Sequence, residues 1–216
     1  MESLIQTITI YALPVLFGIT LHEAAHGYVA RMFGDPTAWQ AGRISLNPVR
    51  HIDFIGTIVV PLVLLFSTKM LGGGGLLFGW AKPVPVDWSR LRRPKRDMLW
   101  VALAGPASNM LMAIVWALGL RALAETGSGP DNFWVQMTIA GIQVNLILMA
   151  LNMLPLPPLD GGRIVFSLLP QRMAWQYSKI EPYGLLILIV LMLTGVLWLL
   201  LQPLLAFGQL IVSWFL

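Results

Sequence analysis

The sequence predicts an all-α protein that crosses a membrane several times. Apolar residues make up 57% of its 216 residues and charged residues 11%, whereas soluble domains contain roughly 45–50% and about 25%. The apolar residues also fall into stretches near the length of about 20 residues that a spanning helix needs. Since the few polar side chains cannot cover such a chain in water, we expect an integral, multi-pass protein in a lipid bilayer.

The apolar stretches predict about five to six membrane segments. They cover residues 4–31, 54–80, 98–123, 133–154, 183–201 and 204–216. The last stretch follows Gln202 and Pro203, so we expect a separate short span or an interfacial helix there. No repeat, low-complexity run or long linker is visible. This predicts a single domain over residues 1–216, with a core at 4–162 and C-terminal membrane segments at 183–216.

The second stretch, residues 54–80, is expected to form a re-entrant hairpin. Basic residues precede and follow it, and the positive-inside rule places both groups in the cytoplasm. Two full crossings need about 40 residues, but this stretch supplies 27. A hairpin that turns at the glycines 72–75 returns the chain to the same side. Residues 38–50, which surround Gly42, are expected to add a small β element at the cytoplasmic surface.

The charged residues and the missing cysteines exclude several functions. The net charge of +4 comes from 14 basic and 10 acidic residues. Because this small excess lies between apolar stretches, we expect no nucleic-acid partner. The chain contains no Cys, which excludes both a disulfide framework and a thiolate metal site.

Three ionisable residues lie inside the first apolar stretch, in the sequence His22-Glu23-Ala24-Ala25-His26. Ionisable side chains within a span are costly, and by default they mark a functional site. The two histidines are four residues apart, so a helix puts both imidazoles on one face, close enough to share a zinc ion. The glutamate is turned about 100° away and can reach a water molecule beside the metal. This H-E-x-x-H pattern is typical of zinc metalloproteases.

A third protein ligand is expected, because catalytic zinc sites generally have three plus a water molecule. Without Cys, it must be His, Asp or Glu. Asp160 is the favoured candidate, since it follows the fourth span in an apolar segment broken by three prolines and followed by two glycines. Two alternatives stay open: Asp160 is a helix N-cap, or the third ligand is His51 or Asp53 near the hairpin.

Three motifs in order along the chain point to a known family. They are residues 22–26, Gly105-Pro106-Ala107-Ser108-Asn109, and the run from Asn152 through Pro155, Pro157 and Leu159 to Asp160-Gly161. Together they resemble the intramembrane site-2 metalloproteases. Residues 42–53 resemble the same segment of compact prokaryotic members without a PDZ or CBS domain. Those members often have Pro where Phe54 stands in this sequence.

The resemblance implies one Zn²⁺ per chain, bound by His22, His26 and Asp160, with Glu23 as the general acid/base. It also implies that Asn109 positions substrate or stabilises the oxyanion, and that the proline loop lies beside the cleft. The substrate-binding residues would then be Asn109, Asn152, Pro155 and Pro157. Residue type alone gives Asn109, Gln143 and Asn145 a simpler role, namely a hydrogen bond to a neighbouring helix.

We therefore expect a zinc metalloendopeptidase that hydrolyses peptide bonds within or near transmembrane segments of membrane-protein substrates, as in regulated intramembrane proteolysis. His26 lies five residues before Arg31, or about 7.5 Å along a helix. This places the site near the cytoplasmic face of a bacterial plasma (inner) membrane. The alternative is a zinc or divalent-metal transporter, which needs polar groups on two facing spans.

Overall fold

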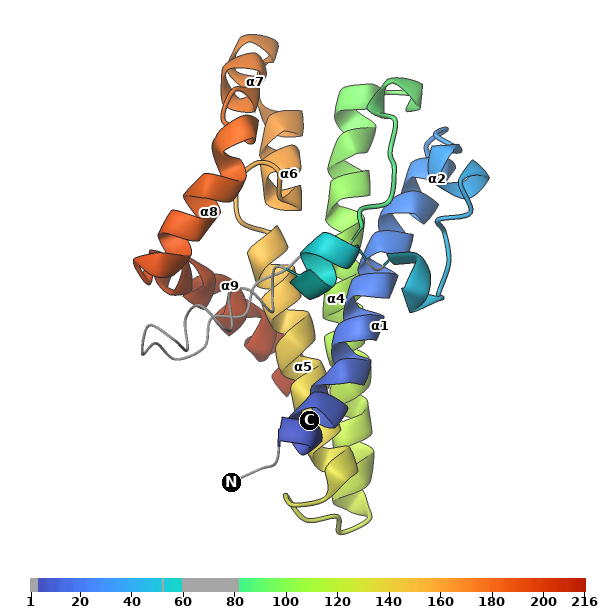
Figure 1. The fold of residues 1–216 in the computed structure, drawn as a ribbon, viewed down its shortest axis with the longest axis vertical. Coiled ribbons are helices and arrows are strands. Elements are labelled where there is room, and N and C mark those ends of the chain that lie inside the picture. The colour runs from blue at the N-terminus through green and yellow to red at the C-terminus, as the bar shows by residue number, and fades with distance from the viewer. Residues whose placement is uncertain (1–3, 52, 60–81) are drawn as a thin grey trace.

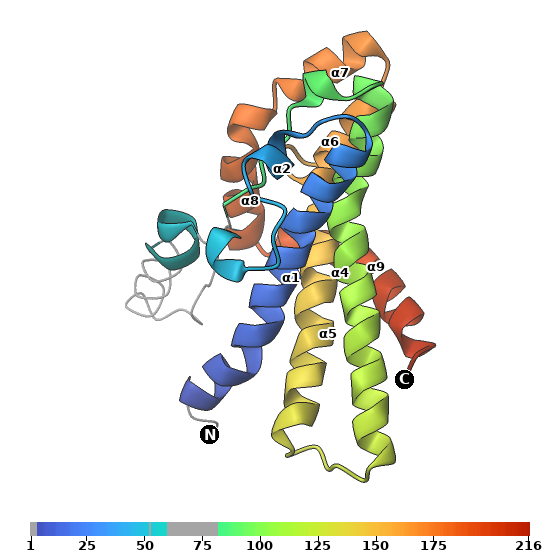
Figure 2. The ribbon, with the colours of Figure 1, turned by 90° about the vertical axis from the view of Figure 1, so that its right-hand side faces the viewer.

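The computed structural model describes residues 4–51, 53–59 and 82–216 of the chain. Three long helices form its centre: α1 (Leu4–Met32), α4 (Pro94–Glu125) and α5 (Phe133–Asn152). These helices lie side by side along the long axis of the molecule, and α4 packs against both of the others (Figures 1 and 2). The all-α prediction is confirmed for this part of the chain.

Shorter helices and turns surround the three central helices. They are α2 (Thr37–Gln40), η1 (Pro48–His51), η2 (Phe54–Val59), η3 (Trp88–Arg90), α6 (Asp160–Leu168), α7 (Gln171–Ser178), η4 (Glu181–Tyr183), α8 (Gly184–Leu193) and α9 (Val196–Ser213). The short helix α6 packs against α4 at the end of the molecule where α1 terminates, whereas α9 packs against α5 (Figure 1). The first of these contacts brings the chain after α5 back toward α1.

Local sequence explains where the central helices begin and end. Pro94 opens α4 at a position whose backbone N–H would have no partner within the helix. The side chain of Asn132 caps α5 by accepting the Trp134 backbone N–H at 2.8 Å. Just beyond α1, Gly34 has a φ of 110°, a left-handed conformation that favours glycine. The observed bounds lie within a few residues of the predicted ones.

Within the part of the chain that the structure describes, five helical regions are long and apolar enough to cross a membrane. They are Ile5–Met32, Pro94–Glu125, Phe133–Asn152, Gln171–Leu193 and Val196–Ser213. This number agrees with the five to six segments expected from the sequence. The protein is thus a polytopic, all-helical membrane protein.

The C-terminal helices differ from the expectation. The sequence predicted a span over 183–201 and a break at Pro203, but α9 continues through Pro203. The chain breaks instead at Gly195, whose φ is 75°. Only glycine adopts this left-handed conformation without a steric penalty. A proline inside a membrane helix is tolerated when neighbouring groups satisfy the freed carbonyl, so Gly195 sets the boundary.

The small β element expected at residues 38–50 is also absent. This segment forms α2, a turn at Gly42 and the 3₁₀ turn η1, and residues 4–51, 53–59 and 82–216 contain no strand. The carboxylate of Asp35 explains the helical turn, because it accepts hydrogen bonds from both the backbone N–H (3.0 Å) and the hydroxyl of Thr37. Of the expected hairpin, residues 54–59 form a π-helical turn. Its remainder, including the glycine turn, lies outside the described residues.

Small residues allow the central helices to approach closely. A Cβ added at Gly141 of α5 would lie 2.5 Å from Cγ of Trp116 on α4. Buried apolar residues fill the space between α4, α5 and α9, including Ala113, Ala117, Leu146, Met149, Ala150, Leu201 and Leu205. Since lipid tails are as apolar as these side chains, such close packing is what holds membrane helices together.

Candidate metal centre

Three side chains from two distant parts of the chain meet near the α6 end of the helix bundle. Asp160 Oδ2 lies 3.1 Å from His22 Nε2 and 3.3 Å from His26 Nε2. The two Nε2 atoms are 3.1 Å apart. Among the residues that the structure describes, this is the one group of three or more His, Asp or Glu side chains that could share a metal ion.

The local structure of both segments explains this meeting. Helix α1 is continuous across residues 22–26, so His22 and His26 stand one turn apart on the same face. After α5 the chain passes through a proline loop, and α6 starts at Asp160 itself. Gly161 follows, where a Cβ would lie 2.5 Å from the backbone carbon of Met153. A larger residue would therefore move Asp160 away from the imidazoles.

In each imidazole, the hydrogen bond made by Nδ1 determines how Nε2 faces Asp160. His26 Nδ1 lies 2.7 Å from the backbone oxygen of Val101, which can only accept, so Nδ1 carries the hydrogen. His22 Nδ1 lies 2.6 Å from Oδ1 of Asn109. The Asn109 amide cannot be reversed, because its Nδ2 donates to the carbonyl of Gly18 at 3.0 Å. With Nδ1 carrying the hydrogen, the neutral form of each imidazole presents an Nε2 lone pair to Asp160.

The convergence of these atoms fits a zinc ion. Asp160 Oδ2 is buried and has no hydrogen-bond partner, while two Nε2 lone pairs point toward it. Three electron-pair donors this close repel one another unless a proton or a metal cation lies between them, and a zinc ion satisfies all three at once. Ligands at about 2.0–2.1 Å in a tetrahedral zinc site lie roughly 3.3–3.4 Å apart, close to the observed 3.1–3.3 Å.

Gly105 of α4 provides the space in which both imidazoles lie. A Cβ at this position would come within 2.5 Å of His22 Cε1 and 2.6 Å of His22 Nε2. Within the Gly105–Asn109 motif, the sequence analysis gave Gly105 no role of its own. The structure shows that any side chain here would displace the two histidines.

Glu23 has one oxygen fixed by a distant backbone group. Its Oε2 accepts the N–H of Val84 at 2.7 Å, and Val84 belongs to an extended segment, residues 82–87. The Arg43 guanidinium donates to the carbonyl of Lys82 at 2.9 Å and so holds this segment. The sequence analysis missed Val84, because a backbone N–H from a distant segment carries no residue-type signal.

The far end of the extended segment is held by Asp35, at the end of α1. Its Oδ2 accepts the Asp87 backbone N–H at 2.7 Å. The Ser89 hydroxyl in turn donates to the Asp87 carboxylate, and this hydrogen bond holds the pKa of Asp87 below its usual range. Both ends of residues 82–87 are thus tied down, with Val84 between them.

Asn109 lies beside the metal centre, but its amide is fully used. Its Oδ1 accepts from His22, and its two N–H groups donate to the carbonyl of Gly18 and to Oδ1 of Asn145 at 3.1 Å. The side chain is completely buried. No N–H remains for an oxyanion or a substrate, so this geometry argues against the role that the family resemblance implied.

The other expected site residues lie outside the cluster. Asn152 donates to the carbonyl of Leu148 within its own helix at 3.0 Å. The carbonyl of Pro155 accepts from the Tyr177 hydroxyl at 2.9 Å. Pro157 is buried in the loop that precedes α6, against Gly162 and Gly184. These contacts give the three residues packing roles in the structure.

The two alternative third ligands also have other partners. His51 is buried in η1, where its Nε2 contacts the backbone oxygen of Ser45 at 2.9 Å. Asp53 Oδ1 accepts the backbone N–H of Gly56 at 2.7 Å. Neither residue belongs to the group that could share an ion.

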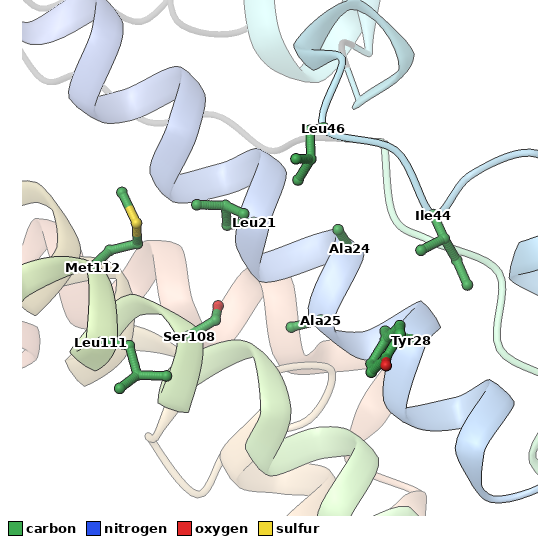
Figure 3. Close-up of a pocket in the computed structure, with 9 residues that line it drawn as sticks. All are labelled: Leu21, Ala24, Ala25, Tyr28, Ile44, Leu46, Ser108, Leu111 and Met112. Carbon is green, nitrogen blue, oxygen red and sulfur yellow. The ribbon is translucent and has the colours of Figure 1, made fainter. Parts of the chain in front are cut away.

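An apolar hollow of about 400 Å³ lies between α1, α4 and residues 44–46 (Figure 3). It is lined by Leu21, Ala24, Ala25, Tyr28, Ile44, Leu46, Ser108, Leu111 and Met112. None of the residues that line the hollow is His22, His26 or Asp160, so the hollow is not the metal centre itself.

Known proteins that are similar in sequence to this chain are named "Putative zinc metalloprotease". The model of the family described as "Peptidase family M50" matches residues 122–195. A Bacillus subtilis protein named "Putative zinc metalloprotease YwhC" is 36% identical over 203 residues, which cover 90% of this chain and 85% of that protein. "Putative zinc metalloprotease Rip2" of Mycolicibacterium smegmatis is 30% identical over 181 residues, or 83% of this chain and 64% of that protein. No solved structure matches the chain significantly.

Proposed function

Because this chain belongs to peptidase family M50, the site-2 protease family, and is a zinc metalloprotease, we propose that it is an intramembrane endopeptidase that cuts membrane-protein substrates within or near their transmembrane segments. One observation carries this proposal. Two imidazole lone pairs and a buried carboxylate oxygen converge within a membrane-helix bundle, and Glu23 lies on the same helix turn. The catalytic unit is a single domain spanning residues 1–216.

His22, His26 and Asp160 are assigned as the three protein ligands of one zinc ion. The hydrogen bonds from each Nδ1 support this assignment, because they orient the rings and fix the tautomer in which Nε2 can bind a metal. A bound zinc ion supplies a Lewis acid that makes water a nucleophile near neutral pH and polarises a peptide carbonyl. Two His and one carboxylate form a common catalytic zinc set.

Glu23 is assigned as the general acid/base. It is next to His22 in the chain, half-buried, and held at Oε2 by the Val84 N–H. This leaves Oε1 to take a proton from the attacking water and then deliver it to the leaving amide nitrogen. The fixed Oε2 means that little reorientation is needed between the two transfers.

The position of the centre in the bundle suggests the access route and the type of substrate. His26 lies about 7.5 Å along the helix from Arg31, and the positive-inside rule, applied to the basic segments beside α6, supports a cytoplasmic position for this end in a bacterial cell. Water can then reach the centre from the cytoplasmic side. A substrate helix must unwind before its peptide bonds are exposed.

A cleavage assay with a zinc-loaded protein in lipid nanodiscs tests this function. Its substrates are tagged model proteins whose single transmembrane segment contains helix-breaking residues, and the cut position is read by mass spectrometry. The wild type should cut within or next to the transmembrane segment. Glu23→Gln should retain zinc but lose about 10²–10⁴-fold in rate. Equal activity in this variant, or cuts confined to the soluble tags, would refute the proposal.

A further inference from the structure

A buried chain of hydrogen bonds connects α5 to the metal centre. Asn145 Nδ2 donates to the carbonyl of Gly141 at 2.8 Å, and Asn145 Oδ1 accepts from Asn109 Nδ2 at 3.1 Å. Asn109 Oδ1 then accepts from His22 Nδ1 at 2.6 Å. Both asparagine side chains are fully buried. Three helices thus contribute to one continuous path that ends on an imidazole.

The direction of every bond in this path is fixed by its ends. The carbonyls of Gly18 and Gly141 can only accept, so they determine which side of each amide is nitrogen. With the Asn145 amide in this orientation, its Oδ1 receives an N–H of Asn109. Asn109 must then present Oδ1, and not Nδ2, to His22. The Gly18 carbonyl and Asn145 Oδ1 therefore hold the Asn109 amide together, and the tautomer of His22 depends in part on Asn145, a residue that does not touch it.

We propose that Asn145 is a positioning residue for His22, which acts through Asn109 by fixing, together with the Gly18 carbonyl, the orientation of the Asn109 amide. The inference rests on the proposed function in one respect, that His22 is a zinc ligand. It gives Asn109 a role in metal retention in place of contact with an oxyanion. If the Asn109 amide rotated, His22 Nδ1 would face a donor, and its ring would have to turn or change tautomer.

A simpler role for Asn145 is adhesion between helices, since polar side chains often hydrogen-bond across membrane interfaces. The two roles differ in what they affect. An adhesive residue contributes to the stability of the bundle whether or not zinc is bound. Its substitution either leaves the rate of zinc loss unchanged or changes it independently of Asn109, so that the two effects add. A positioning residue changes zinc retention, and its effect disappears once Asn109 is removed.

The experiment measures how fast zinc-loaded protein in nanodiscs loses its metal to excess EDTA, together with the unfolding temperature of the zinc-free protein. The variants are Asn145→Ser, Asn109→Ala and the double variant. A serine can still donate to the Gly141 carbonyl but cannot reach Asn109. Asn145→Thr replaces it if the serine variant does not fold. Thr138→Val is the matched control, because the buried Thr138 hydroxyl on α5 bonds only to Val135 within its own helix (2.8 Å).

We expect Asn109→Ala to accelerate zinc loss about 10- to 100-fold, as is typical when a partner of a metal-bound His is removed. Asn145→Ser should accelerate it by a smaller factor, about three- to tenfold, because it acts through one intermediate residue. The double variant should match Asn109→Ala alone, and Thr138→Val should match the wild type.

Two results would overturn the proposal: wild-type zinc loss in Asn145→Ser, or an Asn145 effect that persists at full size in the Asn109→Ala background. His22→Ala separates this failure from a failure of the proposed function. If His22→Ala retains zinc as the wild type does, the ligand assignment itself is wrong. If it releases zinc while Asn145→Ser does not, only the positioning role of Asn145 is wrong.

Discussion

The carboxylate of Glu23 accepts a hydrogen bond from the backbone N–H of Val84 at 2.7 Å. This contact joins the middle of a membrane helix to an extended segment far along the chain. The segment is held in turn by the Arg43 guanidinium, which donates to the carbonyls of Lys82 at 2.9 Å and Pro83 at 3.4 Å. The orientation of Glu23 therefore depends on a residue outside the H-E-x-x-H motif.

Replacing Arg43 should slow catalysis without releasing zinc. In Arg43→Ala the segment loses its anchor at the Lys82 and Pro83 carbonyls, so Val84 fixes Glu23 less firmly, and we expect kcat to fall on the order of tenfold. Arg43→Lys keeps a single donor nitrogen on a more flexible side chain, so its kcat should lie between those of the wild type and Arg43→Ala. The measurement is kcat and KM on a model transmembrane substrate, with zinc content determined in parallel.

Arg121→Ala is the control for this prediction, since its pair with Glu125 is exposed and lies at 3.5 Å, which contributes little. A fall in zinc content in Arg43→Ala would mean that the residue supports the metal centre as a whole. An unchanged kcat would show that Glu23 needs no help from the extended segment.

Asp160 should prove to be the third zinc ligand. Its buried Oδ2 has no hydrogen-bond partner and lies 3.1 Å from His22 Nε2, so its removal leaves two imidazoles with no carboxylate. We expect Asp160→Ala to bind zinc more than about 100-fold more weakly than the wild type, a larger loss than the removal of an outer partner. Competition with a chelator of known affinity measures this change.

Asp53→Asn is the matched comparison, because Asp53 was an alternative ligand by sequence and its Oδ1 bonds to the Gly56 backbone N–H. It should retain wild-type zinc affinity. The reverse result, with zinc retained in Asp160→Ala and lost in Asp53→Asn, would transfer the third ligand to the segment before η2.

The site was predictable from sequence where helical periodicity or residue chemistry determines it. The four-residue spacing of His22 and His26 fixes their relation within any continuous helix. Asp160 was favoured because a chain without Cys needs another third ligand and because of the family resemblance, while His51 and Asp53 stayed open as alternatives. The hydrogen-bond partners of the two Nδ1 atoms were harder to predict. The Val101 carbonyl, for example, is a backbone group that every residue possesses. The Asn145 link depends on how α5 packs against α4.

The fold shows the same division between local and long-range information. Apolar stretches predicted α1, α4 and α5 well, because hydrophobic length is a property of each segment alone. The last break was misplaced since Pro203 and Gly195 are both helix breakers by type. The sequence does not reveal which one the packed bundle tolerates. Residues 38–50 were misassigned because a side chain from outside the segment, that of Asp35, stabilises a helical turn.

Gly105→Ala should damage the metal centre, although alanine normally favours a helix. The added Cβ would lie 2.5–2.6 Å from the His22 ring, which is buried and hydrogen-bonded to Asn109. We expect zinc affinity to fall on the order of tenfold or more, with activity falling in parallel.

Gly119→Ala on the same helix is the control, because its Cβ would meet only Thr138 Cγ2 at an ordinary 3.4 Å. This variant should keep its zinc and gain up to about 1 kcal/mol of stability from helix propensity. Wild-type zinc affinity in Gly105→Ala would show that α1 and α4 can separate enough to admit a methyl group.

Gly195→Ala should destabilise the C-terminal helices without affecting zinc. Its φ of 75° lies in the left-handed region, which costs a residue with a Cβ roughly 1–2 kcal/mol. No atom lies within 4 Å of the Cβ position, so this penalty comes from backbone conformation alone. The unfolding free energy in detergent should fall by that amount, whereas zinc affinity stays the same. Gly129→Ala, equally open but without a positive φ, should change little. If the two variants were equally stable, the chain would have another way to connect α8 to α9, and the break at Gly195 would not be what separates these helices.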